Sequence, residues 1–326
     1  MPLSLRWGTV TAVAERHDRL VRLEVDGDPC IAYPGLTGDV AVGDVVLVNT
    51  QARDLGLGSG GFDVLYVNLT RGLRLSAAQG AHVISQPYAP GQHTVRFAEE
   101  DVALQSGLDG MPVVCCSLHS QLAPVAAALA GLRVAYLQLG GGALPVSLSD
   151  VVRALRGRGL LEVAVAVAPC VEGDVQCVTP ASALLTAAVR GAQVVVAGIG
   201  PGIVGTGTRY GHGGLAAAEA ANAACALGGT AVLAPRVSHA DERERHQGLS
   251  HHTRAALELC LGNVHVAWPS GLDVPEGIVV ETVDVAGWQE ACAALPLLHM
   301  GRGPEHDPWF FAAAFAAGLL ARRFTG

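Results

Sequence analysis

Short alternating runs of hydrophobic and polar residues occupy the first 70 positions of the chain. The runs are residues 8–13, 20–25, 42–48 and 64–67. This alternation is typical of strands with one buried face. Asp26 and Gly27, directly after the second run, are a pair typical of a tight hairpin turn. The pattern predicts a small β-barrel-like domain over residues 1–75.

From about residue 110 the pattern changes to apolar runs of strand length, separated by Ala- and Leu-rich helical segments. The runs are residues 112–116, 133–139, 161–168, 193–197, 230–234 and 263–267, and the helical segments include 147–156, 180–190, 214–227 and 250–261. Strands that are apolar throughout and alternate with helices indicate a parallel sheet covered on both faces. The sequence therefore predicts an α/β domain over residues 76–326 with a doubly wound, Rossmann-like sheet.

Two glycine-rich segments follow predicted strands, and ligands of doubly wound sheets bind beyond the carboxyl ends of the strands. The glycines are Gly140, Gly141 and Gly142 in the first segment, and Gly200, Gly202 and Gly205, followed by Thr206 and Thr208, in the second. The second segment matches the dinucleotide-binding pattern, but no helix begins within it and no acidic residue ends the next strand. For the first segment, backbone N–H groups that bind an anion and plain turn glycines are both open interpretations. For the second segment, close approach of the backbone to a ligand is favoured over a merely flexible loop.

The segment 236–254 holds four of the twelve histidines and four of the 21 arginines. Ser250 is the expected N-cap of a helix, which places His251 and His252 in its first turn, where the helix dipole favours neutral imidazoles. Neutral imidazoles act as bases, metal ligands or hydrogen-bond donors. We expect proton transfer by the histidines and anion binding by the arginines and a serine. The residues are His246, His251 and His252, supported by His119, and Arg236, Arg243, Arg245 and Ser238.

Two other interpretations of this segment stay open. In a helix over 239–246, His239, Glu242 and His246 would share one face and could hold a divalent metal ion, although no standard zinc spacing is present. In a solvated helical turn, Asp241–Arg245 and Glu242–His246 would instead pair at i,i+4.

All 21 basic residues are arginine, because the chain contains no lysine. The absence of lysine excludes a Walker A nucleotide site and a Schiff base with pyridoxal phosphate. A net charge of −8 argues against nucleic acid and anionic membranes as partners.

Compartment and targeting are inferred from the cysteines and the apolar runs. The eight cysteines include no Cys-x-x-Cys pair, and no secretory leader is evident, so a cytoplasmic location is expected. The longest apolar stretch, residues 309–321, is too short to span a membrane and predicts a buried helix that begins at Asp307 and Pro308.

Together these motifs resemble a bacterial family of proteins of unknown function, the domain of unknown function 3866. The matching segments are residues 54–61, 118–120, 142–145, 200–208, 236–253 and 300–309. The loop at residues 169–177 departs from the family pattern. The resemblance implies no reaction, cofactor or substrate.

The convergence of the glycine-rich segments and the Arg/His segment on one sheet edge predicts an enzyme that acts on a small anionic metabolite by hydrolysis or group transfer. The alternative is a metabolite-binding or assembly protein without turnover, since no nucleophile–base motif is recognised. Base rates for soluble oligomers favour a homodimer.

Overall fold

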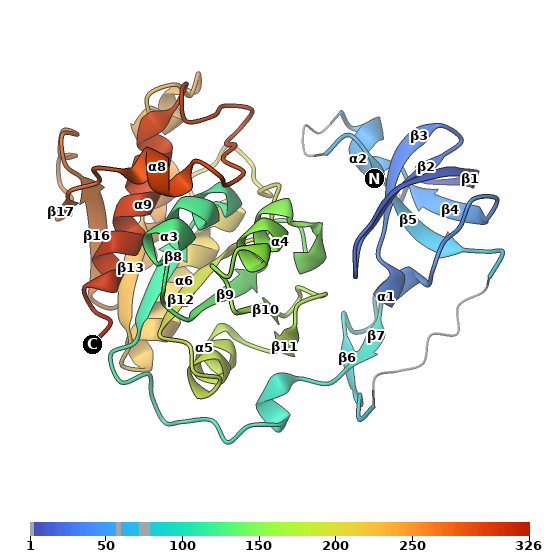
Figure 1. Cartoon of the computed structure of the whole chain (residues 1–326), viewed down its shortest axis with the longest axis horizontal. Helices are drawn as coiled ribbons and strands as arrows, with labels where there is room; N and C mark the ends of the chain where they lie inside the picture. The colour runs from blue at the N-terminus through green and yellow to red at the C-terminus, as the bar shows by residue number, and fades with distance from the viewer. Residues whose placement is uncertain (1–2, 57–59, 72–78) are drawn as a thin grey trace. The chain divides into compact units, whose positions relative to one another are not determined.

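The computed structural model describes residues 3–56, 60–71 and 79–326, and the chain forms two compact units, Met1–Val95 and Arg96–Gly326 (Figure 1). The domain boundary expected at residues 75–76 lies outside the described residues, as do residues 57–59 of the first resemblance segment.

The first unit contains a closed five-stranded barrel with strand order β1-β2-β3-β5-β4. The strands are β1 (Leu5–Arg16), β2 (Val21–Val25), β3 (Asp28–Ala32), β4 (Val45–Asn49) and β5 (Asp63–Asn68). Asp26 and Gly27 both have positive φ angles, 52° and 85°, and connect β2 to β3 as the turn pair predicted. Alternate residues such as Val46 and Val48 point into the barrel core, so the predicted barrel is confirmed.

Shorter elements complete the first unit. They are the helices α1 (Pro34–Thr37) and α2 (Gln51–Asp54) and a separate hairpin of β6 (Val83–Ser85) and β7 (His93–Val95).

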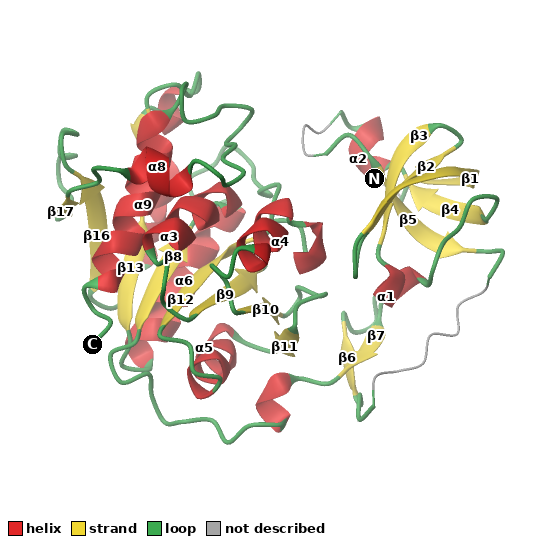
Figure 2. Cartoon of the chain, in the orientation of Figure 1, coloured by secondary structure: helices red, strands yellow, loops and turns green. Residues whose placement is uncertain are grey.

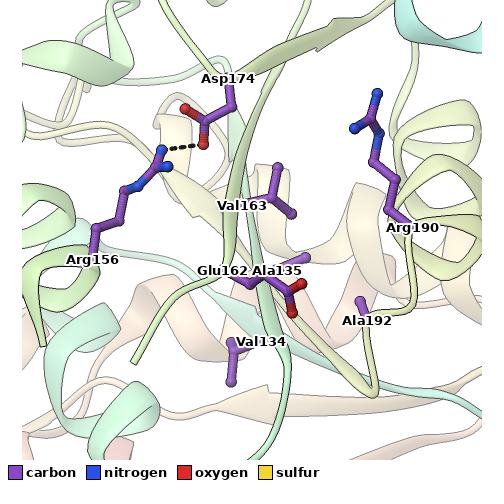
Figure 3. A pocket seen from close by; sticks show the side chains of 8 residues that line it. All are labelled: Val134, Ala135, Arg156, Glu162, Val163, Asp174, Arg190 and Ala192. Atoms are coloured by element: carbon purple, nitrogen blue, oxygen red, sulfur yellow. Dashed lines mark hydrogen bonds and ion pairs between the residues drawn. The ribbon is translucent and has the colours of Figure 1, made fainter. Parts of the chain in front are cut away.

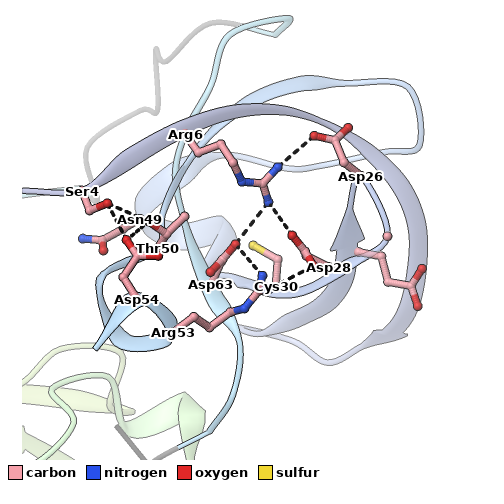
Figure 4. Close-up of polar contacts among 12 residues, drawn as sticks. Ser4, Arg6, Asp26, Asp28, Cys30, Asn49, Thr50, Arg53, Asp54 and Asp63 are labelled. Atoms are coloured by element: carbon pink, nitrogen blue, oxygen red, sulfur yellow. Dashed lines mark hydrogen bonds and ion pairs between the residues drawn. The ribbon is translucent and has the colours of Figure 1, made fainter. Parts of the chain in front are cut away.

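Arginine–carboxylate pairs link the ends of several barrel strands (Figure 4). Asp63, whose side chain is fully buried, accepts hydrogen bonds from Arg6 at 3.3 Å and from Arg53 at 3.2 Å. Arg6 and Arg53 also pair with Asp28, so the charges compensate one another. Burial and the nearby Asp63 raise the pKa of the Cys30 thiol to about 12. We interpret this network as structural.

The second unit is built on an eight-stranded, all-parallel sheet, ordered β11-β10-β9-β12-β8-β13-β16-β17. Its strands are β8 (Pro112–Cys116), β9 (Val134–Leu139), β10 (Val163–Val167), β11 (Val175–Cys177), β12 (Val194–Ile199), β13 (Thr230–Ala234), β16 (Val264–Pro269) and β17 (Glu281–Val283). The six predicted strands are all present. The two edge strands β11 and β17 were not predicted, because each has only three residues and no long apolar run.

Helices cover both faces of this sheet (Figure 2). One layer is α3 (Leu122–Ala128), α4 (Asp150–Gly157), α8 (Trp288–Cys292) and α9 (Pro308–Arg322), and the other is α5 (Pro180–Val189), α6 (Ala216–Ala226) and α7 (His251–Leu259). Neighbouring strand residues face opposite layers: Val114 belongs to the first core and Val113 to the second. None of the helices in the described ranges is long and apolar enough to cross a membrane.

The remaining elements are short connections. They are the 3-10 turns η1 (Ala98–Glu100), η2 (His119–Gln121), η3 (Val146–Leu148), η4 (Gly213–Leu215) and η5 (Glu244–His246), and a two-residue hairpin of β14 (Val237–Ser238) and β15 (Gly248–Leu249).

The centre of the sheet contains the topological switch. After β8 and β9 the chain passes to the layer of α3 and α4, whereas after β12 and β13 it passes to the layer of α6 and α7. Because β8 lies between β12 and β13, neighbouring loops diverge to opposite faces at the carboxyl ends of these strands. This divergence is where doubly wound sheets bind ligands. The loops after β8, β9, β12 and β13 are those that the sequence singled out.

Candidate functional site

Four imidazole rings pack together beyond the carboxyl ends of β12 and β13. We call His212, His246, His251 and His252 the histidine cluster. His212 and His252 stack with ring centroids 3.8 Å apart, and His251 lies 4.8 Å from His246 and 4.5 Å from His252. His212 comes from the glycine-rich loop after β12, so the cluster joins two loops that are far apart in the sequence.

The start of α7 orients three of these rings. Ser250 is the N-cap, as predicted, and its Oγ accepts a hydrogen bond from the backbone N–H of His252 at 3.2 Å. The same oxygen lies 2.7 Å from Nδ1 of His246. The backbone of Arg236 is bonded to Thr253 Oγ1 and to the Ser250 N–H, which ties the end of β13 to the helix.

Hydrogen bonds determine the tautomers of two cluster histidines. His212 Nε2 lies 3.1 Å from the carbonyl oxygen of Arg209, so Nε2 donates and Nδ1 carries the lone pair. Arg236 Nη1 lies 3.1 Å from Nδ1 of His252, so this nitrogen accepts and Nε2 carries the proton. His212 Nδ1 and His251 Nε2 are buried and have no hydrogen-bond partner among the described residues.

All four cluster histidines have lowered pKa values. Burial is the main cause in each case, and the neighbouring Arg236 charge adds to it. The pKa is lowered to about 3 for His246 and to about 2 for His252. The cluster therefore consists of neutral imidazoles at neutral pH.

Beside the cluster lies a group of ion pairs, the arginine–aspartate network. Asp241, whose side chain is 2% exposed, accepts from Arg236 at 3.1 Å, from Arg243 at 2.8 Å and from Arg302 at 3.3 Å. Arg302 also pairs with Asp307 at 3.4 Å. The network has three guanidinium groups and two carboxyl groups, so it has one positive charge in excess when both are ionised.

Burial and hydrogen bonding act in opposite directions on the pKa values of this network. Burial alone would raise the pKa of Asp241, but the hydrogen bonds and charges of Arg243 and Arg236 hold it well below its usual range. Burial lowers the pKa of Arg236 to about 10, which still leaves it charged. Ser238 donates a hydrogen bond to Asp307 at 2.6 Å, so its hydroxyl is committed to the network.

A serine–histidine pair lies at the same edge and was not predicted. Ser120 Oγ lies 3.1 Å from Nδ1 of His299, whose ring stacks on Phe310 at 3.8 Å. Burial, with the charges of Arg236 and Arg302, lowers the pKa of His299 to about 3, which places this ring close to the network. The only sequence signal was Ser120 after β8, because His299 stands outside every predicted element.

His119 is separate from the histidine cluster in its contacts. Its Nε2 lies 2.7 Å from Ser149 Oγ, and its Nδ1 lies 3.2 Å from the carbonyl oxygen of Ile199. Burial lowers its pKa to about 4. Ser149 is itself the N-cap of α4, so His119 links the loop after β8 to the start of that helix.

The glycine-rich segments pack against each other. A Cβ on Gly213 would lie 2.0 Å from the Gly141 carbonyl oxygen, and one on Gly142 would lie 2.3 Å from that of Gly200. Val204 N–H donates to the Gly141 carbonyl at 2.9 Å, and Gly205 pairs with His212 in a β-bridge. The glycines therefore allow close contact between two loops, and that contact positions His212. Their expected role as an anion cradle stays a prediction.

The other glycine-loop residues have different surroundings. Gly140 faces Pro169, and Gly202 has a positive φ of 72°. Thr206 and Thr208 are exposed, and their hydroxyls bond each other at 2.8 Å.

The metal-binding interpretation that required a helix over residues 239–246 is wrong. This segment consists of an irregular loop over residues 239–243 and the 3-10 turn η5, so His239, Glu242 and His246 have no common helix face. His239 and Glu242 are exposed, whereas His246 is buried in the cluster. Within the described ranges, the histidines whose ligand atoms lie within 4.8 Å of one another are His212, His251 and His252.

The i,i+4 pairs of the alternative interpretation, a solvated helical turn, are absent for the same reason. Asp241 pairs with Arg236, Arg243 and Arg302 instead, and Arg245 lies exposed on η5. Among the predicted residues, the structure thus brings together Arg236, Arg243, His246, His251 and His252. It does not bring Arg245, His119 or His239 to them.

A hollow of about 380 Å³ lies at the opposite edge of the sheet (Figure 3). It is lined by Val134, Ala135, Arg156, Glu162, Val163, Asp174, Arg190 and Ala192. Arg156 and Asp174 pair across it. Its strand residues belong to the amino ends of β9 and β10, so it is distinct from the site described above.

The fold and the site define a two-unit chain that carries an Arg- and His-rich site at the switch point of a Rossmann-like sheet. The chain belongs to the family described as "Protein of unknown function (DUF3866)", whose model matches residues 29–318. The resemblance inferred from the motifs is confirmed. No curated protein matches the chain.

Proposed function

We propose that the chain is a cytoplasmic enzyme that acts on a small anionic metabolite by hydrolysis or group transfer. The observation that carries the proposal is the position of the histidine cluster beside a network with more guanidinium than carboxyl groups. Both lie where the loops of the sheet diverge. An excess positive charge in a partly buried site favours a phosphate or carboxylate ligand.

The arginines divide into two roles according to exposure. The side chains of Arg243 and Arg302 are 38% and 21% exposed. Each keeps N–H groups that can donate hydrogen bonds to an anion. Arg236 is 2% exposed and donates to both Asp241 and His252, so we assign it as a positioning residue. The neutral imidazoles of His246 and His251 are suited to take up or donate protons, or to bind a metal ion.

Covalent catalysis is not favoured by the described residues. Burial raises the pKa of every cysteine thiol, to about 12 for Cys116 and Cys292, so none is an activated thiolate. The Ser120–His299 pair has no carboxylate on the other imidazole nitrogen, which is buried without a hydrogen-bond partner in the described part of the chain. Hydrolysis would therefore use water as the nucleophile.

The same observation supports a second candidate function. A protein that binds an anionic metabolite without converting it needs the guanidinium groups but no nucleophile. This function predicts strong stabilisation by a ligand that is recovered unchanged.

A metabolite screen distinguishes the two functions. The purified chain is heated with phosphorylated and carboxylated metabolites, with and without divalent metal ions, and each stabilising compound is then assayed for conversion. For the converted compound, replacing His251 and His252 together with asparagine should lower turnover by at least about 100-fold. His17→Asn, in the barrel, is the control. Unchanged turnover in the double variant would contradict the assignment of these histidines.

A further inference from the structure

Two imidazole nitrogens of the histidine cluster are buried without a hydrogen-bond partner among the described residues, and proton transfer does not explain them. We propose that His212, His251 and His252 bind one divalent transition-metal ion, with Zn²⁺ chemistry. Metal binding does not depend on the proposed function, because it can be measured without a substrate.

The three imidazoles are placed as a ligand set. Their ligand atoms lie within 4.8 Å of one another, whereas nitrogens around a tetrahedral Zn²⁺ are about 3.4 Å apart. The rings of His212 and His252 are stacked with an angle of 18° between their planes, so they must rotate out of this stack to point their nitrogens at one ion. His251 and His252 lie on the first turn of α7, and His212 is held by the packed glycine loops. Two separate elements therefore support the ligands.

Two buried nitrogens support this assignment directly. His212 is 9% exposed, and its Nε2–H donates to the Arg209 carbonyl, which leaves the Nδ1 lone pair buried with no hydrogen-bond partner among the described residues. Metal-binding histidines characteristically donate their other N–H to a carbonyl or carboxylate in this way. His251 Nε2 is a second buried nitrogen of this kind. A bound ion would compensate for the desolvation of both nitrogens.

Binding through His252 also requires a change of hydrogen bonds. Arg236 donates to Nδ1 of His252, so Nε2 carries the proton, and a metal ion at Nε2 needs that proton on Nδ1. The guanidinium has no acceptor and must therefore leave the imidazole. It retains Asp241 as its partner at 3.1 Å, so the buried arginine stays paired.

The donor set also indicates the class of ion. Three neutral imidazoles without carboxylate or thiolate suit Zn²⁺ or Co²⁺ and do not suit Mg²⁺ or Ca²⁺, which prefer oxygen ligands. Three protein ligands leave a fourth position for water, as in catalytic zinc sites. Activated water at that position would be the nucleophile that the described side chains do not supply.

Metal titration of the full chain tests the proposal. The purified protein is stripped with a chelator, and Co²⁺ or Zn²⁺ is added while stoichiometry and affinity are measured by equilibrium dialysis. We expect one ion per chain and a tetrahedral Co²⁺ spectrum without thiolate charge-transfer bands. His212→Asn, His251→Asn and His252→Asn should each weaken binding at least tenfold, while His239→Asn and His17→Asn should not.

Each other outcome overturns the proposal. These outcomes are no stoichiometric ion, a thiolate-type Co²⁺ spectrum from the cysteines, or loss of the ion in His239→Asn. The wild-type spectrum and stoichiometry remain decisive if a ligand variant does not fold. A chain that binds the ion but converts no metabolite would support the metal site and contradict the proposed function.

Discussion

At the scale of single residues, Asp241 controls the charge balance of the site. Its carboxylate is 2% exposed and accepts from three arginines, one of which, Arg236, is itself 2% exposed. A buried ion pair contributes little net stability compared with apolar side chains, but the removal of one partner leaves the other charge buried and uncompensated. Asp241 is thus needed mainly because Arg236 is buried.

Asp241→Asn should destabilise the chain by about 3–5 kcal/mol, because Arg236 loses its compensating charge. Urea denaturation followed by circular dichroism measures the change in the free energy of unfolding. Glu258→Gln is the matched control: it removes the exposed pair with Arg209 and should leave the free energy of unfolding nearly unchanged. Equal losses in the two variants would show that Arg236 does not depend on Asp241.

His119 gives a pH dependence of known sign. Its pKa is lowered from 6.5 to about 4 by burial, so below pH 6.5 the unfolded chain takes up a proton that the folded chain does not. The stability contributed by neutral His119 is complete above pH 6.5 and is lost between pH 6.5 and 4, by up to about 1.4 kcal/mol per pH unit.

Comparison of wild type with His119→Gln isolates this effect from the other histidines. The free energy of unfolding is measured at pH 7 and pH 5, and the decrease between them should be smaller in the variant by up to about 2 kcal/mol. An identical decrease in both proteins would mean that His119 takes up its proton over the same pH range in the folded and the unfolded chain.

At the scale of elements, the glycine-rich loops act as structural partners of each other. Gly141 and Gly213 approach so closely that neither tolerates a side chain, and this contact positions the adjacent His212. The sequence indicated that some group lies very close to the backbone of the loop after β12. The structure shows that the glycine-rich loop after β9 is one such group. Sequence patterns cannot separate these cases, because a ligand and a neighbouring backbone both require the absence of Cβ.

Gly213→Ala should lower stability by at least about 1–3 kcal/mol, because its Cβ would overlap the Gly141 carbonyl. Gly207→Ala is the matched control in the same loop, since no atom lies within 4 Å of its added Cβ. Thermal denaturation compares the two variants. A midpoint in Gly213→Ala equal to that of the control would contradict the packed-loop arrangement.

At the scale of the whole molecule, strand order determines which loops meet. β12 lies between β9 and β8, and β13 follows β8, so four loops from positions 117 to 250 converge at the carboxyl edge. The resulting site combines a cluster of neutral imidazoles with a charged network. Because the site needs all four loops in place, the metal titration and the metabolite screen also test the arrangement of these loops in the second unit.

The sequence by itself determined the barrel, the six long strands of the sheet and the N-cap at Ser250, because hydrophobic periodicity and capping are local properties. It also indicated Arg236, His246, His251 and His252, since they follow one strand within 20 residues. Only the tertiary structure decided that His212 and His299 belong to the site, that His239 and Glu242 do not, and that Asp241 compensates Arg236. These outcomes depend on contacts between loops distant in sequence, and on the absence of a helix at 239–246, which the folded surroundings determine.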